Sequence, residues 1–87
     1  MSELADLLRE CLVHIERSAD SMYAGQSAAD IAEMFRAAIA KLERGEPINK
    51  GALKILFLPT GDLQEISIDN GWGDEFVALA ARFDRAI

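Results

Sequence analysis

The chain has 87 residues, which is enough for one small domain and too few for two. Hydrophobic residues make up 51% of it and charged residues 28%, a balance that can bury an apolar core and excludes a disordered, highly charged tail. Fifteen acidic residues against nine Lys and Arg give a net charge of −6, which opposes binding to nucleic acid and to anionic membranes. We therefore expect a single helical domain over residues 1–87, with no nucleic-acid or membrane partner.

The N-terminal segment and the cysteine content bear on the cellular compartment. Cys11 is the sole cysteine and cannot form an internal disulfide, while Glu3 and Asp6 occupy positions where a secretory signal has basic residues. The longest apolar run, at residues 76–81, is much shorter than the roughly 20 residues of a membrane-spanning helix. These features predict a cytoplasmic protein. Because so small a domain buries a limited core, formation of a homodimer would add stability.

The first predicted helix begins after Ser2, a suitable N-cap, and ends near Gly25, a suitable stop. Its apolar residues recur at steps of three and four, which places them on one face of a helix. They are Leu4, Leu7, Leu8, Cys11, Leu12, Ile15, Ala19 and Met22.

The second predicted helix begins at Ser27, whose hydroxyl can accept a hydrogen bond from the amide of Asp30. Gly45 and Pro47 end it, as glycine and proline commonly do. The apolar face consists of Ile31, Met34, Phe35, Ala38, Ile39 and Leu42.

The stretch from residue 46 to residue 69 allows two interpretations, because the short apolar run within it fits a helix or a strand. In the first, Pro47 takes an early helical position, the helix runs to about Phe57, a Pro-Thr-Gly turn follows at 59–61, and a further helical turn starts near Asp62. In the second, residues 54–68 form a β-hairpin. We favour the helix, since a lone hairpin is marginally stable and the rest of the chain is helical.

The last predicted helix starts near Asp74, after a glycine-containing loop at 69–73, and runs to the end of the chain. Phe76, Leu79, Ala80, Phe83 and Ile87 share one face of it, and Trp72 continues that face. The predicted fold is therefore all-α, a small bundle of three to four main helices, with the hairpin giving an α+β fold as the alternative. The predicted core consists of Leu4, Leu8, Cys11, Leu12, Ile15, Ile31, Phe35, Ile39, Leu42, Leu53, Leu56, Phe76, Leu79 and Phe83.

Residues suited to catalysis or metal binding are scarce. Cys11 and His14 lie three apart, but a zinc site needs three or four ligands and the chain has no other Cys or His. Gly71 and Gly73 do not form a phosphate-binding motif, and no calcium loop follows Asp69. We therefore expect no enzyme activity, no cofactor and no metal.

Residues 55–81 hold five acidic residues and no Lys or Arg, which is the most distinctive charge pattern in the chain. Such a surface can steer a basic protein partner, and a tryptophan among the acids could anchor the interface. Acids at a helix start can also serve capping alone, and the tryptophan could belong to the core. The predicted partner-binding residues are Asp62, Glu65, Asp69, Trp72, Asp74 and Glu75.

Residues 58–66 (LPTGDLQEI) and 70–76 (NGWGDEF) resemble the closing half of a family of small, uncharacterised, mostly helical bacterial proteins. The resemblance covers roughly residues 46–84 and implies helical structure in that stretch, with a constrained turn around Gly61 and Trp72. In size and charge the chain is also similar to immunity proteins, which neutralise toxins. The resemblance brings no catalytic residues with it.

These observations predict a non-enzymatic protein-binding module that uses the acidic 62–75 region, an immunity or inhibitory role being one form of it. The alternative is a small-molecule-binding or accessory subunit, with a pocket between the last helix and the turn at Gly61.

Overall fold

The computed structural model describes residues 3–59 and 61–87, so the predicted cap Ser2 and Thr60 of the predicted turn lie outside the described residues. The described chain forms five helices and no strand. They are α1 (Glu3–Glu16), α2 (Ala28–Glu43), α3 (Lys50–Leu56), α4 (Asp62–Asp69) and α5 (Gly73–Ala86). The all-α prediction is confirmed, and α3 and α4 occupy the stretch where the alternative placed a hairpin.

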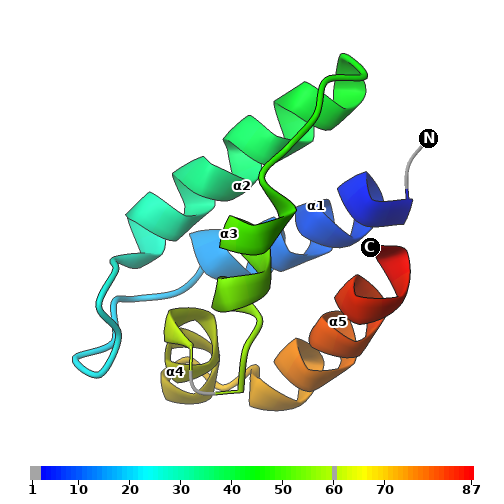
Figure 1. The fold of residues 1–87 in the computed structure, drawn as a ribbon. Helices are drawn as coiled ribbons and strands as arrows, with labels where there is room; N and C mark the ends of the chain where they lie inside the picture. Colours follow the sequence, from blue (N-terminus) through cyan, green and yellow to red (C-terminus); the bar gives the residue numbers. More distant parts are fainter. Residues whose placement is uncertain (1–2, 60) are drawn as a thin grey trace.

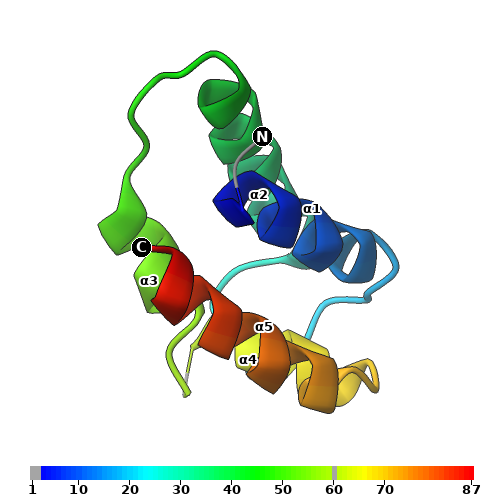
Figure 2. The ribbon, with the colours of Figure 1, turned by 90° about the vertical axis from the view of Figure 1, so that its right-hand side faces the viewer.

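The helices pack around α1, which contacts α2, α4 and α5. Helices α1 and α2 lie side by side and run in opposite directions, while α3 leads the chain back toward α4 (Figure 1). Helices α4 and α5 lie against each other on the other side of α1 (Figure 2). Among the residues that the structure describes, no helix has the length and apolar character needed to cross a bilayer.

Both ends of α2 form as the sequence predicts. Ser27 Oγ accepts a hydrogen bond of 3.0 Å from the Asp30 amide at the start of the helix. At the other end Gly45 has a φ of +72°, and the Glu46 amide donates to the Lys41 carbonyl at 2.8 Å. This is a Schellman motif, in which a residue with positive φ lets the chain fold back onto the last carbonyls of the helix.

The first helix is shorter than predicted. It ends at Glu16, because the backbone beyond it turns and Ser18 Oγ donates a 2.8 Å hydrogen bond to the His14 carbonyl. Ala19 and Met22 therefore lie in the loop between α1 and α2, and the Met22 side chain is 85% exposed. The prediction that they continue the apolar face of the helix is wrong.

Helix α3 begins later than predicted. Pro47 lies in the connecting segment, and the N-cap is Asn49, whose Oδ1 accepts a 3.0 Å hydrogen bond from the Ala52 amide. The side-chain cap therefore fixes the start of the helix in place of the proline. The helix ends at Leu56, as the helical interpretation of this stretch expected.

Phe57, which follows α3, joins the aromatic residues of the core. Its ring centroid lies 4.4 Å from that of Phe83, 6.0 Å from Phe35 and 6.2 Å from Phe76. These distances are typical of favourable aromatic pairs. Phe57 thus connects α2 and α5 through one buried ring, although it was not among the predicted core residues.

The predicted core is buried apart from Leu12 and Leu42, which are partly buried at its edge. The larger buried side chains absent from the predicted list are Leu7, Phe57, Leu63, Ile66 and Trp72. Leu63 and Ile66 lie on α4, whose length was underestimated. The core therefore extends further toward α4 than the sequence indicated.

Candidate functional site

The structure brings all six predicted binding residues to one end of the bundle. Asp62, Glu65 and Asp69 are on α4, Trp72 is the N-cap of α5, and Asp74 and Glu75 are in its first turn. Because α4 and α5 contact each other, these residues form one region (Figure 1). Some of these residues bind other parts of the fold, and the others make no ion pair or side-chain hydrogen bond within the described residues.

Trp72 is buried in the core of this fold. It is 5% exposed, and its ring stacks on His14 with the centroids 4.9 Å apart. Its Nε1 donates a 2.8 Å hydrogen bond to Ser18 Oγ, which satisfies the one polar group of the buried indole. The prediction of Trp72 as an interface residue is corrected on this ground: packing against the end of α1 removes the ring from the surface.

Asp69 and Asn70, at the end of α4, bind the loop between α1 and α2 (residues 17–27, hereafter the α1–α2 loop). Ser21 Oγ donates a hydrogen bond of 2.5 Å to the Asp69 carboxylate. The Asn70 side chain accepts from the Ala19 amide and donates to the Ala19 carbonyl, both at 2.9 Å. Asn70 therefore pairs with Ala19 as a second peptide group would, and holds the loop at this point.

Asp62, at the start of α4, holds the same loop further along. Its Oδ1 accepts a 2.8 Å hydrogen bond from the Gly25 amide. A Cβ on Gly25 would lie 3.5 Å from the other Asp62 oxygen, which is ordinary contact. The α1–α2 loop is thus attached to both ends of α4, and two of the predicted binding acids, Asp62 and Asp69, serve this attachment.

The attached loop presents two large apolar side chains to solvent. Met22 and Tyr23 (hereafter the tip) are 85% and 71% exposed, more than any other large hydrophobic residue among those described. Within the loop, Ser21 Oγ accepts from the Tyr23 amide and the Ser21 carbonyl accepts from the Ala24 amide, both at 3.2 Å. The tip therefore projects from a hydrogen-bonded turn whose two sides are fixed to α4.

The remaining predicted acids carry charge that the described chain does not neutralise. Glu65, Asp74 and Glu75 form no ion pair and no side-chain hydrogen bond within residues 3–59 and 61–87. Every ion pair among the described residues uses an acid outside residues 55–81. The pairs are Arg9–Asp6, Arg9–Glu43, Arg36–Glu16, Arg44–Glu46 and Arg82–Glu10. The end of the bundle at α4 therefore keeps its negative charge.

Two exposed apolar side chains accompany these acids. Ile68 on α4 is 56% exposed and Val77 on α5 is 63% exposed. A Cβ on Gly73, at the start of α5, would lie in ordinary contact with Ile68 Cγ1 at 3.5 Å, which places Ile68 beside the start of α5. We call the group formed by Glu65, Ile68, Asp69, Asp74, Glu75 and Val77 the acidic surface.

Cys11 and His14 do not form a reactive pair. Cys11 is buried, and burial raises the pKa of its thiol to about 12, so the thiol stays protonated at neutral pH. His14 stacks on Trp72. Among the described residues, no three His, Cys, Asp or Glu side chains are grouped so as to hold a metal ion.

The turn at Gly61 is tightly packed. A Cβ on Gly61 would lie 2.8 Å from the Ile55 carbonyl oxygen and 3.1 Å from that of Leu56, which real side chains do not tolerate. The predicted small-molecule pocket lay between this turn and the last helix. The structure describes an apolar groove between α2 and the start of α3, and the pocket beside the Gly61 turn stays a prediction.

Sequence reasoning places Met22 on a helix and does not single out Ser21, Tyr23 or Asn70. The signal that could have found the loop is its composition, since Ser21 and Gly25 belong to a stretch of turn-forming residues between two helices. The attachment to Asn70 has no local signal, because Ala19 and Asn70 are 51 residues apart.

Comparison of the chain with family models, with curated proteins and with solved structures finds no match. The resemblance of residues 46–84 to small helical bacterial proteins therefore stays a prediction. Function has to be inferred from the geometry.

Proposed function

We propose that this chain is a non-enzymatic protein-binding module, and that the tip and the neighbouring acidic surface form its contact face. An immunity or inhibitory role is one form that such binding takes. The proposal keeps the acidic 62–75 region as part of the interface but replaces Trp72 by Met22 and Tyr23 as the apolar anchors.

One observation carries the proposal: the two most exposed large apolar side chains lie on a loop that side chains of the acid-rich segment hold in place. Met22 and Tyr23 leave most of their apolar surface in solvent, and residues of these types are enriched at protein interfaces. The attachment through Asp62, Asp69 and Asn70 limits the entropy that the loop would lose on binding.

The charge around the tip defines the partner. Asp20 lies in the loop itself, and Asp74 and Glu75 are unpaired within the described chain on the adjoining acidic surface. A partner with an apolar pocket surrounded by Lys and Arg complements both features. Charge of this kind chiefly raises the association rate, and salt reduces the effect.

The test is affinity capture from the native lysate, followed by binding kinetics with the captured protein after it has been purified. The charge variant is Asp74→Lys with Glu75→Lys, because both side chains are exposed and form no ion pair within the described residues. We expect its association rate at low salt to fall by about tenfold. The tip variant, Met22→Ser with Tyr23→Ser, should raise the dissociation constant by about tenfold or more.

The matched control is Glu33→Lys with Asp84→Lys, which changes the net charge equally at exposed positions away from the acidic surface. An equal slowing by this control would mean that net charge alone is responsible. Unchanged binding by the tip variant and the charge variant would overturn the proposal. Concentration-dependent self-association of the purified chain, without another partner, would replace it by a homodimer.

A further inference from the structure

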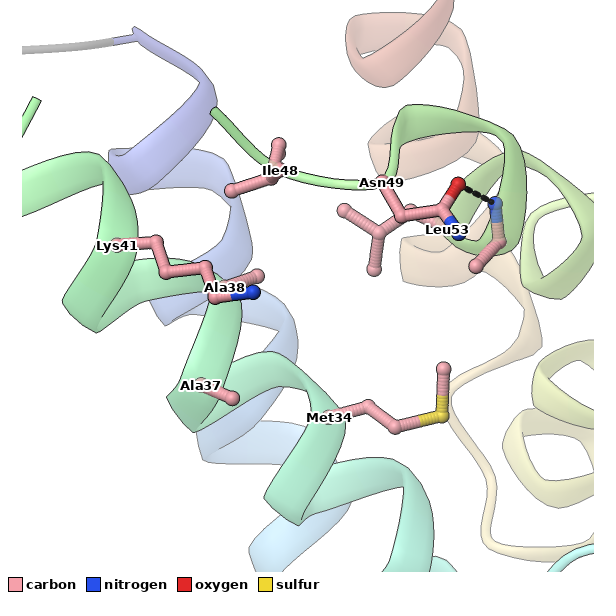
Figure 3. A pocket seen from close by; sticks show the side chains of 8 residues that line it. Met34, Ala37, Ala38, Lys41, Ile48, Asn49 and Leu53 are labelled. Atoms are coloured by element: carbon pink, nitrogen blue, oxygen red, sulfur yellow. Dashed lines mark hydrogen bonds between the residues drawn. The ribbon is translucent and has the colours of Figure 1, made fainter. Parts of the chain in front are cut away.

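A groove crosses the surface between the second half of α2 and the start of α3, away from the acidic surface. Its volume is about 190 Å³, and Figure 3 shows side chains from both helices converging on it. The lining residues are Met34, Ala37, Ala38 and Lys41 from α2, and Ile48, Asn49, Ala52 and Leu53 from α3 and the segment before it. Neither the helix packing nor the proposed protein contact uses this groove.

The walls of the groove are apolar and its size suits one small hydrophobic group. Six of the eight lining residues are apolar, and three of these are alanines, which leave the space open. An apolar cavity of about 150 Å³ is large enough to bind benzene. The Met34 thioether reaches toward α3 in Figure 3, and such a side chain adapts readily to a ligand. One ring or a short branched chain therefore fits, whereas a drug-sized molecule, which needs roughly 300 Å³ or more, does not.

The two polar residues of the lining both have donors that a ligand can use. Asn49 already uses its Oδ1 to accept from the Ala52 amide, which leaves its Nδ2 facing no partner among the described residues. Lys41 can only donate, and within the described chain it forms no ion pair. Its side chain extends from α2 along one side of the groove, with Asn49 on the other side (Figure 3). A ligand that complements these groups carries an acceptor, and an anionic one is favoured by the ammonium.

Lys41 stands out against the charge of the whole chain. It is the one charged residue among the eight that line the groove, whereas the chain carries a net charge of −6. The pKa of the Glu46 carboxyl is lowered by its hydrogen bond from Arg44 and by the charge of Lys41, so Glu46 competes with an anionic ligand for this lysine. An anion is attracted here, in contrast to the acidic surface.

We propose that the groove between α2 and α3 binds a small carboxylate with a single ring or a short branched chain as its apolar body. The apolar body lies against the alanines and Leu53, and the carboxylate lies at Lys41. This site is separate from the proposed protein contact, so neither proposal depends on the other.

The test uses three probes with the full chain labelled with nitrogen-15, followed by NMR. Phenylacetate has the ring and the carboxylate, 2-phenylacetamide is its neutral counterpart, and acetate lacks the ring. We expect phenylacetate to shift the amides of Ala37, Ala52 and Leu53, with a dissociation constant on the order of 1 mM. Phenylacetamide should bind about threefold more weakly, and acetate should leave these amides unchanged. Shifts absent with phenylacetate, or spread evenly over the chain, would overturn the proposal.

Two variants separate a groove site from weak binding elsewhere. Ala37→Leu places a side chain in the groove from an exposed position of α2 and should reduce the phenylacetate affinity at least tenfold. Its control is Ala78→Leu, the same change at an exposed position of α5, which should have no effect. Lys41→Gln should remove the preference for phenylacetate over 2-phenylacetamide. It should leave the affinity for 2-phenylacetamide unchanged. Equal binding by Ala37→Leu and the control, with both variants folded by circular dichroism, would place the ligand outside the groove and overturn the proposal.

Discussion

The two ends of this small bundle are held together by different kinds of interaction. Where α1 and α2 pack, apolar side chains interlock and ion pairs such as Arg9–Glu43 and Arg36–Glu16 connect the helices at the surface. Where α4 meets the α1–α2 loop, hydrogen bonds make the connection instead: Asp69 accepts one from Ser21, and Asn70 both accepts from and donates to the Ala19 backbone.

The difference explains why one end of the molecule keeps its negative charge. Asp62 and Asp69 bind a backbone amide and a hydroxyl, which are neutral donors, so their charge is not cancelled. Acids at the other end pair with arginines, as in Arg82–Glu10. A cluster of acids can thus be structural and still present a charged surface to a partner.

The largest expected effect comes from the apolar region. Phe35→Ala should lower the free energy of unfolding by about 3–5 kcal/mol, because the ring is fully buried and its removal leaves a cavity. That is a large share of the stability of a domain this small. Urea unfolding followed by circular dichroism measures the loss. A variant as stable as the wild type would contradict the role of this ring in the core.

Asn70→Ala tests the polar region. We expect a loss of about 0.5–1.5 kcal/mol, because the substitution removes the hydrogen bonds to the exposed Ala19 amide and carbonyl, which water can then solvate. The effect should be local, in contrast to that of the core substitution. Amide hydrogen exchange should show that Ala19 loses protection while α2 keeps its own. Equal loss of protection in α2 would show that the two regions are not independent.

Gly71→Ala tests the turn that ends α4 and sets the position of Trp72. Gly71 has a φ of +80°, where a Cβ costs about 1 kcal/mol, so the variant should lose roughly that much stability. The matched control is Gly51→Ala within α3, where the nearest atom to a Cβ lies at 3.4 Å and the helix should gain about 0.5–1 kcal/mol. Both changes are measured by thermal unfolding, and shifts of the same sign would contradict the assignment of strain to Gly71.

The smallest expected effect concerns the exposed ion pairs. The hydrogen bond from Arg82 lowers the pKa of the Glu10 carboxyl below its ordinary value of 4.5. The charged form is therefore favoured in the folded state, and its contribution to stability is present above pH 4.5 and lost as the pH falls through the lowered pKa. Glu10→Gln should be slightly less stable than the wild type at neutral pH and equal to it in acid. Thermal unfolding across pH checks this, with Glu33→Gln, at an exposed acid that forms no ion pair within the described residues, as the control.

Features of the fold that depend on residues close together in the sequence could be predicted, and features that depend on distant residues could not. The ends of α2 were correct because Ser27 and Gly45 act on their own helix. The end of α1 was wrong because no residue near Glu16 marks it strongly, and the following backbone is held instead by Asn70.

The sequence indicated where the candidate site lies, but not which of its residues are buried. Charge counted along the sequence found the acidic end, since Asp74 and Glu75 are neighbours in the chain. Whether Trp72 faced the core depended on its contacts with His14 and Ser18, more than 50 residues away, and no periodic pattern encodes such contacts.

The pairing of Asn70 with Ala19 also bears on the order in which the molecule assembles. It joins residues 51 positions apart, so the chain between them must be ordered before the bonds can form. We expect this pairing to form after the folding barrier, with the consequence that its loss speeds unfolding and leaves the folding rate nearly unchanged. The tip would then be the last part of the chain to take its shape and the first to lose it. Only the fully folded chain would therefore present the proposed contact residues to a partner.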